Sequence, residues 1–405
     1  MRERDAAAPS EPRDRALAEQ IAAGVVKNLL LLRHHLEHYS GKSIAQIDPL
    51  VVKILAIAMY QLKFLDRVPA SAAVDQAVEQ TKRFGRRRSA GFVNAVLRNV
   101  GRQPPPAIPD ASSNPEEYAK LVLSHPPELF RRLAELLGVE RALAFCRHDN
   151  VEPPTIVRLF KGVDPSVLVE SDVQIEPHQE PGLLVVHGAR RAVLAQWAQG
   201  GLAQVQDATA AGIIEYMRIL PGQCVLDRCA GLGTKTLQIH ERVGPAGHVV
   251  AVDPSAFRCD ALRQSLDDRQ ITNVKIFQVG KLAPIAVEIP RTFDRILIDA
   301  PCSNSGVLAR RPEARFASGP ECLVKLQRSI LYDTVAWLGA DGLLVYSTCS
   351  VWPEENELQI KHLLDRDPTL ALISQHSIWP SFDTTDPRAY HDGGYVAVLQ
   401  KRAGG

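Results

Sequence analysis

Apolar residues recur at helical spacing through most of the first hundred positions of the chain. Between Arg15 and Val100, polar breaks separate four apolar runs, at 29–32, 50–65, 72–84 and 90–100. This pattern predicts a small helical bundle. The next segment, from Gly101 to Pro115, is rich in proline, alanine and serine and shows no period, which is typical of a linker.

The rest of the chain follows a different pattern. We expect two more helices within 116–148 and then a small α+β segment up to residue 201. Beyond it, short strand-like runs alternate with helix-like stretches, which predicts a doubly wound α/β sheet. The strand-like runs are 224–226, 249–252, 274–277, 296–298, 343–346 and 395–399.

A chain of 405 residues is long enough for two or three domains. We predict a helical domain, a linker, a connecting α+β subdomain and a doubly wound α/β domain. Their expected boundaries are 1–103, 104–117, 118–201 and 202–405, respectively.

The seven cysteines show neither disulfide-like nor paired spacing, which favours a reduced compartment and gives no sign of a metal site. The first fifteen residues lack the apolar core of a signal peptide, and Lys53 and Lys63 interrupt the most apolar later run, 51–65. We therefore expect a cytoplasmic monomer without membrane contact.

Two groups of cations stand out, although the net charge is only +1. Nucleic-acid contacts depend on where cations cluster, so both groups are candidates for binding phosphates. For the first group, a solvated helix end is an equally good interpretation. The first group is Lys82, Arg83, Arg86, Arg87 and Arg88, and the second is Arg310 with Arg311.

A glycine-containing loop follows the first strand-like run of the α/β domain, and Asp253 ends the second run. Such glycines let a ligand approach the backbone at a helix N-terminus, and the acidic side chain can accept hydrogen bonds from ribose hydroxyls. The spacing does not fit a P-loop and only partly fits a dinucleotide site, so S-adenosylmethionine is the best candidate. Its expected binding residues are Cys229, Ala230, Gly231, Gly233, Lys235, Asp253 and Asp299.

Two cysteines lie just beyond strand-like runs, in Asp299-Ala300-Pro301-Cys302-Ser303 and Ser347-Thr348-Cys349-Ser350. Ligands of parallel sheets bind beyond the carboxyl ends of strands, so both thiols could reach one catalytic edge. The alternative is that both are small buried residues. Pro301 and the loop residues after it favour the catalytic interpretation.

These segments resemble the cytosine carbon-5 RNA methyltransferases, in particular the bacterial branch that modifies small-subunit ribosomal RNA and carries a NusB-like domain. The resemblance covers nearly the whole chain. In the α/β part it lies in 299–303, 306–307, 310–313, 346–351 and 353–356, and in the helical part it lies in 47–49, 60–62, 65–69 and 92–98.

The resemblance implies a Rossmann-like domain with a mostly parallel sheet of seven strands, S-adenosylmethionine as cofactor and RNA as partner. It also implies that Cys349 is the nucleophile, that Cys302 assists release and that Asp299 contacts the base. A thiolate is needed because carbon 5 of cytosine is a poor nucleophile until a thiol adds to carbon 6. Lys235 would support either the cofactor carboxylate or the base.

Three positions depart from this family's pattern. The cofactor loop has Gly231-Leu232-Gly233-Thr234 where the family has Ala-Pro-Gly-Gly. Gly280 stands where the family has an Asp facing the adenine amine. The match begins at Arg13, whereas members of the family usually have an additional helix before this position.

Other functions also fit the sequence. The same reaction on transfer RNA or at another ribosomal site is the nearest, because target choice depends on surface shape. The other is a non-catalytic RNA-binding homologue with a degenerate cofactor pocket. Retention of both Cys302 and Cys349 with their flanking residues favours the enzyme.

Overall fold

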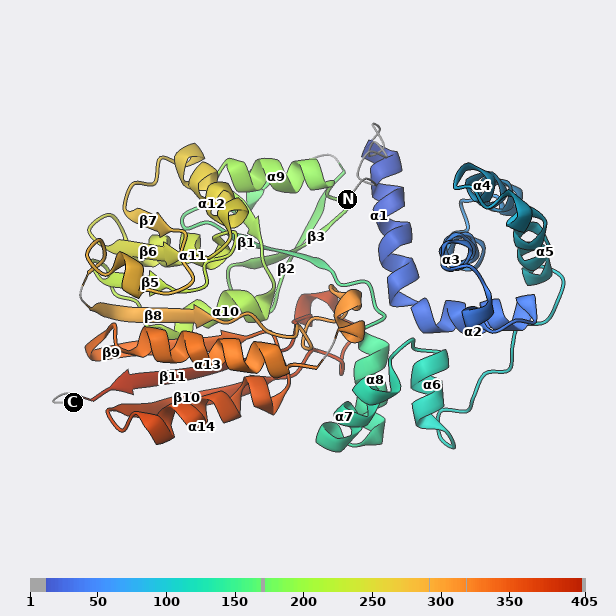
Figure 1. The fold of residues 1–405 in the computed structure, drawn as a ribbon. Coiled ribbons are helices and arrows are strands. Elements are labelled where there is room, and N and C mark those ends of the chain that lie inside the picture. Colours follow the sequence, from blue (N-terminus) through green and yellow to red (C-terminus); the bar gives the residue numbers. More distant parts are fainter. Residues whose placement is uncertain (1–11, 169–171, 291, 318, 403–405) are drawn as a thin grey trace. The chain divides into compact units, whose positions relative to one another are not determined.

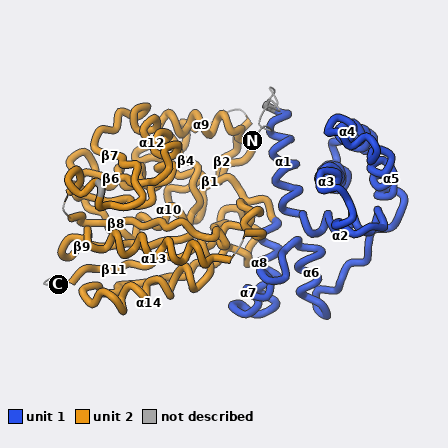
Figure 2. The backbone as a smooth tube through the Cα atoms, in the orientation of Figure 1, with its two compact units in different colours: residues 1–150 blue, residues 151–405 orange. Residues whose placement is uncertain are grey.

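The computed structural model describes residues 12–168, 172–290, 292–317 and 319–402, and the chain forms two compact units. The first unit comprises residues 1–150 and the second residues 151–405 (Figure 2). The predicted connecting subdomain, 118–201, therefore spans the division between them.

The first unit contains a bundle of five helices, as the helical periodicity predicted. Helix α3 is the central one, because it contacts each of the other four (Figure 1). Its Asp48 cap accepts hydrogen bonds from the backbone of Leu50 and Val51, and Leu55 and Met59 are fully buried in the core. The helices are α1 (Pro12–Lys27), α2 (Leu29–Ser40), α3 (Pro49–Phe64), α4 (Ala70–Arg83) and α5 (Ala90–Val100). A preceding helix would fall on residues 1–11, outside the described part of the chain.

Three short helices follow the bundle, where two were expected, so that prediction was wrong. They are α6 (Pro115–Leu121), α7 (Pro127–Leu137) and α8 (Val139–His148). The pair Pro126-Pro127 separates the first two, because proline cannot continue a helix. Gly138, at a φ of 80°, separates the last two.

The second unit begins with a small antiparallel sheet in the order β2-β3-β1-β4. Trp197 on α9 packs with Val157 and Leu184 in its core. The last strand lies just past residue 201, so this α+β part extends beyond its expected boundary. The elements are β1 (Thr155–Leu159), β2 (Gln174–Pro177), β3 (Leu183–His187), α9 (Arg191–Gln199) and β4 (Ala203–Val205).

The large sheet has seven strands in the order β10-β11-β9-β8-β5-β6-β7. Five are mutually parallel, and β11 and β10 complete the sheet in antiparallel fashion, so the predicted doubly wound architecture is confirmed. The strands are β5 (Cys224–Asp227), β6 (His248–Val252), β7 (Val274–Phe277), β8 (Phe293–Asp299), β9 (Leu338–Thr348), β10 (Leu370–Ile378) and β11 (Gly394–Lys401).

Helices cover both faces of this sheet. On one face α13 and α14 bury Leu331 and Leu363, and on the other α10, α11 and α12 bury Ile214, Leu237 and Leu262. The five helices are α10 (Ala208–Tyr216), α11 (Thr234–Val243), α12 (Ala256–Asp268), α13 (Glu321–Val335) and α14 (Glu357–Arg366). Short 3-10 helices in the described residues lie at 44–46, 87–89, 165–168, 283–285, 312–316, 353–355 and 387–389. None of the described helices has the length and apolar character that crossing a membrane requires.

An ion pair joins the small sheet to the large one. Arg158 on β1 donates two hydrogen bonds of 2.9 Å to the carboxylate of Glu241 on α11 and a third, of 3.0 Å, to Gln206. Both partners of the pair are largely buried. Helix α11 begins at the predicted cofactor loop, so this contact holds the helix at the sheet edge where the site lies.

Candidate active site

The two cysteines meet at the carboxyl ends of the neighbouring parallel strands β8 and β9. Asp299 is in register with Ser347, and the backbone of Ala300 donates to Ser347 at 2.8 Å. Although Cys302 and Cys349 are 47 positions apart, their sulfur atoms lie 3.1 Å from each other. The structure therefore brings together the two thiols that the motifs singled out.

Close backbone contacts around Gly306 hold the two cysteine loops together. Its N–H donates to the carbonyl of Cys349 at 2.9 Å, and its own carbonyl accepts from Gly393 at 2.8 Å. A Cβ at position 306 would lie only 2.6 Å from the Gly393 carbonyl group. Glycine is required here because the three backbone segments leave no room for a side chain.

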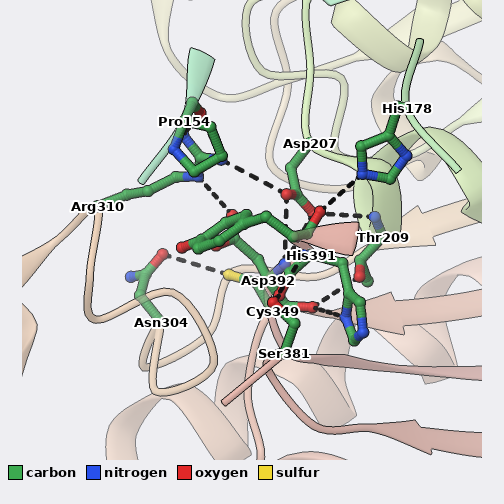
Figure 3. Close-up of polar contacts among 11 residues, drawn as sticks. Pro154, His178, Asp207, Thr209, Asn304, Arg310, Cys349, Ser381, His391 and Asp392 are labelled. Atoms are coloured by element: carbon green, nitrogen blue, oxygen red, sulfur yellow. Dashed lines mark hydrogen bonds and ion pairs between the residues drawn. The ribbon is translucent and has the colours of Figure 1, made fainter. Parts of the chain in front are cut away.

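The two thiols have different surroundings. Cys302 is only 9% exposed, and hydrogen bonding to Cys349, burial and the nearby charge of Glu355 raise the pKa of the Cys302 thiol well above its usual value. Cys349 donates to Oδ1 of Asn304 at 3.3 Å (Figure 3). Asn304 has a φ of 61°, a conformation that asparagine tolerates better than most residues. Its amide also donates to the Cys302 carbonyl at 3.1 Å.

Asp299 links the cysteine loops to the predicted cofactor loop. Its Oδ2 accepts from Nζ of Lys235 at 2.6 Å, and its Oδ1 accepts from the hydroxyl of Ser347 at 2.8 Å. Burial alone would lower the pKa of Lys235, but the negative charge of Asp299 outweighs this effect and leaves the pKa raised. Lys235 is therefore a largely buried cation between the two parts of the site.

The cofactor loop joins β5 to α11 and has left-handed glycines at two positions, Gly231 and Gly233. A Cβ on Gly233 would lie 2.2 Å from the Leu262 side chain. Asp253 at the end of β6 is 3% exposed, and it accepts from the backbone of Gly231 at 3.0 Å and of Ser255 at 2.9 Å. The predicted arrangement is thus present: the glycine loop follows β5, and the acidic residue Asp253 follows β6.

The remaining predicted residues of this loop are Cys229 and Ala230. The backbone of Ala230 donates to Val252 at 3.0 Å, which places the loop against the end of β6. Burial raises the pKa of the Cys229 thiol to about 12, so this cysteine stays neutral beside the acidic side chains. Both residues lie where the backbone passes from the end of β5 to the start of α11.

Asp227, the last residue of β5, shows that a cationic ligand fits this loop. Its Oδ2 accepts from Thr236 at 2.6 Å, whereas its Oδ1 is buried with no hydrogen-bond partner among the described residues. Burial raises the pKa of this carboxyl to about 6. The α-ammonium group of S-adenosylmethionine would supply the missing donor and charge.

Gly280, the position that departs from the family pattern, lies three residues beyond β7. It is exposed, and a Cβ added there would meet no atom within 4 Å. The fully buried Arg228 donates to its carbonyl at 2.6 Å and pairs with Asp333 at 3.0 Å. A buried cation therefore lies next to the position that lacks its usual carboxylate.

The cations proposed to bind RNA fall into two classes. Lys82 and Arg86 are exposed but pair with Glu79 and Asp48, at 2.6 and 2.7 Å. Four others are exposed and have no ion pair within the described residues: Arg83, Arg87, Arg88 and Arg311. These four are available to bind phosphates, and RNA binding by this set stays a prediction.

Arg310 has internal partners instead (Figure 3). Its guanidinium pairs with Asp392 at 2.7 Å and with Asp207 at 3.5 Å, and it donates to the Pro154 carbonyl at 3.3 Å. Burial and the charge of Asp207 raise the pKa of Asp392 to about 7. This ion-pair group ties the loop before β11 to the small sheet, so the geometry favours a structural role for Arg310.

Sequence reasoning did not assign roles to Asp227 and Asn304. Asp227 stands at the strand end directly before the glycine loop, a position from which its role could have been inferred. For Asn304 the only signal was an asparagine in a loop next to a candidate thiol. Its contact with Cys349 depends on tertiary structure that local sequence does not reveal.

The fold and the site together define an S-adenosylmethionine-dependent methyltransferase. The fold is a seven-stranded doubly wound sheet. The site combines the glycine loop, a buried acid after the next strand and a buried carboxylate oxygen that lacks a partner and can accept from an ammonium group. Family models agree: one described as 16S rRNA methyltransferase RsmB/F matches residues 216–391, and that of the NusB family matches residues 1–102. The ribosomal RNA small subunit methyltransferase B of Vibrio cholerae is 31% identical, over 96% of this chain and 90% of that protein. That of Pectobacterium atrosepticum is 30% identical, over 89% and 84%.

The chain therefore belongs to the RsmB/F family of methyltransferases and carries a NusB-family domain at its N-terminal end. Its cofactor is S-adenosylmethionine. Among solved structures, PH0851 is similar over 97% of this chain and 91% of that one, with a TM-score of 0.81 and 21% identity. At that identity, the likeness supports the fold alone.

Proposed function

We propose that the protein methylates carbon 5 of a cytosine in small-subunit ribosomal RNA through covalent addition of Cys349 to the base. The observation that supports this most strongly is the pair of thiols 3.1 Å apart, beside the Lys235–Asp299 pair at the sheet edge that also carries the cofactor loop. Methyl transfer to an atom that is already nucleophilic needs no enzyme thiol. A second thiol is useful when an enzyme adduct must be formed and then resolved.

Each residue has a distinct task in this reaction. Cys349 adds to carbon 6 and makes carbon 5 nucleophilic, and S-adenosylmethionine supplies the methyl group. Asp299, held by Lys235 and Ser347, would hydrogen-bond the cytosine edge and stabilise its protonated adduct. After transfer, Cys302 would help to remove the carbon 5 proton so that Cys349 can leave. Its raised pKa keeps Cys302 a thiol while Cys349 attacks, so Cys302 does not compete as the nucleophile. Cys302 would accept the carbon 5 proton as it gives its own proton to the departing sulfur of Cys349, so that both residues end as thiols.

The choice of substrate follows from the relatives, which are named for acting on small-subunit ribosomal RNA. Exposed cations of the NusB-family domain support RNA as the partner. A substrate in ribosomal RNA also supports a location in the cytoplasm, and we propose that the protein acts as a monomer. Transfer RNA and other ribosomal sites are alternative substrates that use the same chemistry.

The test compares Cys349→Ala and Cys302→Ala with the wild type on unmodified small-subunit ribosomal RNA. Cys349→Ala should abolish methylation and any covalent complex. Cys302→Ala should accumulate a protein–RNA band on a denaturing gel, because attack and transfer proceed while release is impaired. Accumulation in Cys349→Ala instead would reverse the roles. If no band forms in either variant, nor in wild type given RNA with 5-fluorocytosine, covalent catalysis is refuted.

A further inference from the structure

A buried carboxylate lies beneath both cysteine loops. Glu355 is the last residue of the 3-10 helix Pro353–Glu355 and is 0% exposed. Its Oε1 accepts from the backbone of Ser303 at 2.9 Å and from the Gln327 amide at 3.0 Å. Its Oε2 accepts from the hydroxyls of Ser303, at 2.5 Å, and Ser350. No basic residue in the described part of the chain forms an ion pair with it.

These four donor groups, which come from three residues, match the ionised form of Glu355. A carboxylate offers only acceptors, and a buried one is tolerated when hydrogen bonds replace its hydration. Backbone and amide N–H groups can only donate, so one oxygen faces two obligate donors. The two serine hydroxyls donate to the other oxygen. A neutral side chain of the same shape could keep these contacts only by reversing the two serine hydrogen bonds, because a hydroxyl can also accept.

Three of the four donor groups belong to residues that directly follow the two catalytic cysteines. Ser303 follows Cys302, and Ser350 follows Cys349, so one carboxylate joins the two loops through their neighbouring residues. Further contacts place Glu355 itself, because the hydroxyl of Tyr346 on β9 donates to its backbone carbonyl at 2.7 Å. The carboxylate is therefore bound to a strand end on one side and to both thiol loops on the other.

The charge of Glu355 also acts on the Cys302 thiol. It contributes to the raised pKa of Cys302, after hydrogen bonding to Cys349 and burial. Gln327 on α13 reinforces this side, since its amide donates both to Glu355 and to the Pro301 carbonyl, at 2.9 Å, just before Cys302. The contacts to the Cys302 loop thus outnumber those to the Cys349 loop.

We propose that Glu355 is a positioning residue that sets the relative placement of the two thiols by holding the residues that follow them, Ser303 and Ser350. This inference rests on the proposed function, because it assigns Glu355 to the covalent reaction. It predicts that changing Glu355 affects the chemical steps without affecting the glycine loop and Asp253 of the cofactor site, which follow the strands β5 and β6.

The first experiment compares Glu355→Gln with Glu357→Gln in the full chain. Glu357 lies two positions further on, and its carboxylate accepts from Ser377 on β10, away from the cysteine loops. Glu355→Gln should lower kcat and the rate of adduct formation with RNA containing 5-fluorocytosine by about 100-fold, as small displacements of reacting groups do. Its affinity for S-adenosylmethionine should equal that of wild type. Glu357→Gln should match wild type in both measurements.

The serine donors extend the test in case Glu355→Gln does not fold. Ser350→Ala should slow adduct formation, because it frees the Cys349 loop. Ser303→Ala should instead slow release, so that the adduct accumulates as in Cys302→Ala. Each removes few hydrogen bonds, and folding is checked by circular dichroism.

Two results would overturn the inference while leaving the proposed function intact. One is wild-type adduct formation and release in a folded Glu355→Gln. The other is an identical, general loss of cofactor affinity and activity in both serine variants, which would indicate a purely structural role. If wild type itself forms no adduct and transfers no methyl group, the proposed function has failed, whatever the variants do.

Discussion

Asp227 should make cofactor affinity depend on pH. Its carboxyl has a pKa of about 6 in the absence of ligand, because it is buried and lies near the negative charge of Asp299. The ammonium group of S-adenosylmethionine needs the ionised carboxylate. Below pH 6, binding must therefore first remove a proton from Asp227, and affinity should fall as the pH is lowered.

The size of the effect follows from the pKa. With a pKa of about 6, the ionised fraction is about one half at pH 6 and about one eleventh at pH 5, so affinity at pH 5 should be roughly tenfold below its plateau above pH 7. The same raised pKa has a consequence for stability. The folded state holds this proton more tightly than the unfolded state, so the contribution of Asp227 to stability is fully present below its unfolded pKa and is lost as pH rises through 6.

Calorimetric titration with S-adenosylmethionine between about pH 5 and pH 7 measures the affinity, and the α-ammonium group stays protonated over this range. Asp227→Asn should bind more weakly and with no such pH dependence. Asp392→Asn is the matched control, because Asp392 also has a raised pKa, about 7, but belongs to the Arg310 ion-pair group. A constant wild-type affinity from pH 5 to pH 7, or an equal slope in Asp227→Asn, would refute this assignment.

Three further changes test other parts of the molecule. Gly280→Asp should tighten cofactor binding by roughly two- to tenfold in calorimetry, because a Cβ fits there and one hydrogen bond is worth about 0.5–1.5 kcal/mol; Gly280→Ala, which adds no acceptor, should not. Replacing Arg83, Arg87 and Arg88 by Ala should reduce the salt slope of RNA binding by about 2–3, whereas Ala at Arg33, Lys53 and Arg67 should not; equal slopes would assign the cluster to a solvated surface. Glu241→Ala should destabilise the second unit by about 3–5 kcal/mol, since it leaves Arg158 buried and unpaired, while Glu215→Ala in an exposed pair should cost less than about 1 kcal/mol. All four tryptophans lie in that unit, so their fluorescence during urea unfolding reports this difference, and equal midpoints would contradict it.

Hydrophobic patterning was sufficient to predict most of the architecture. Six of the seven strands of the large sheet coincide with apolar runs, because strands buried on both faces are apolar throughout. Strand β10 (Leu370–Ile378) was not predicted because it is an edge strand whose residues are mostly exposed, and its second half, 374–377, is polar throughout. The boundary between two helices at Gly138 was not predicted, because a single glycine also occurs within helices.

The sequence predicted the site's main chemical groups but not how their neighbours would be used. Motif spacing identified Cys302, Cys349, Lys235 and Asp253, since each follows the end of a parallel strand. Arg310 illustrates the limit, because a pair of arginines after a catalytic loop looks the same in sequence whether it faces RNA or two buried carboxylates. Only the tertiary position of Asp207 and Asp392 distinguishes these cases.

The distribution of buried charge explains why the site needs its ligands. Asp227, Asp253 and Asp299 all lie at strand ends of one sheet edge, and Lys235 is the largely buried cation that pairs with Asp299. Asp253 is satisfied by backbone donors, but one oxygen of Asp227 is not. An uncompensated buried acceptor destabilises the free protein, and a cationic cofactor removes that penalty when it binds. The same residue that weakens the empty site therefore gives the cofactor part of its affinity, and this coupling is what the pH dependence of binding measures.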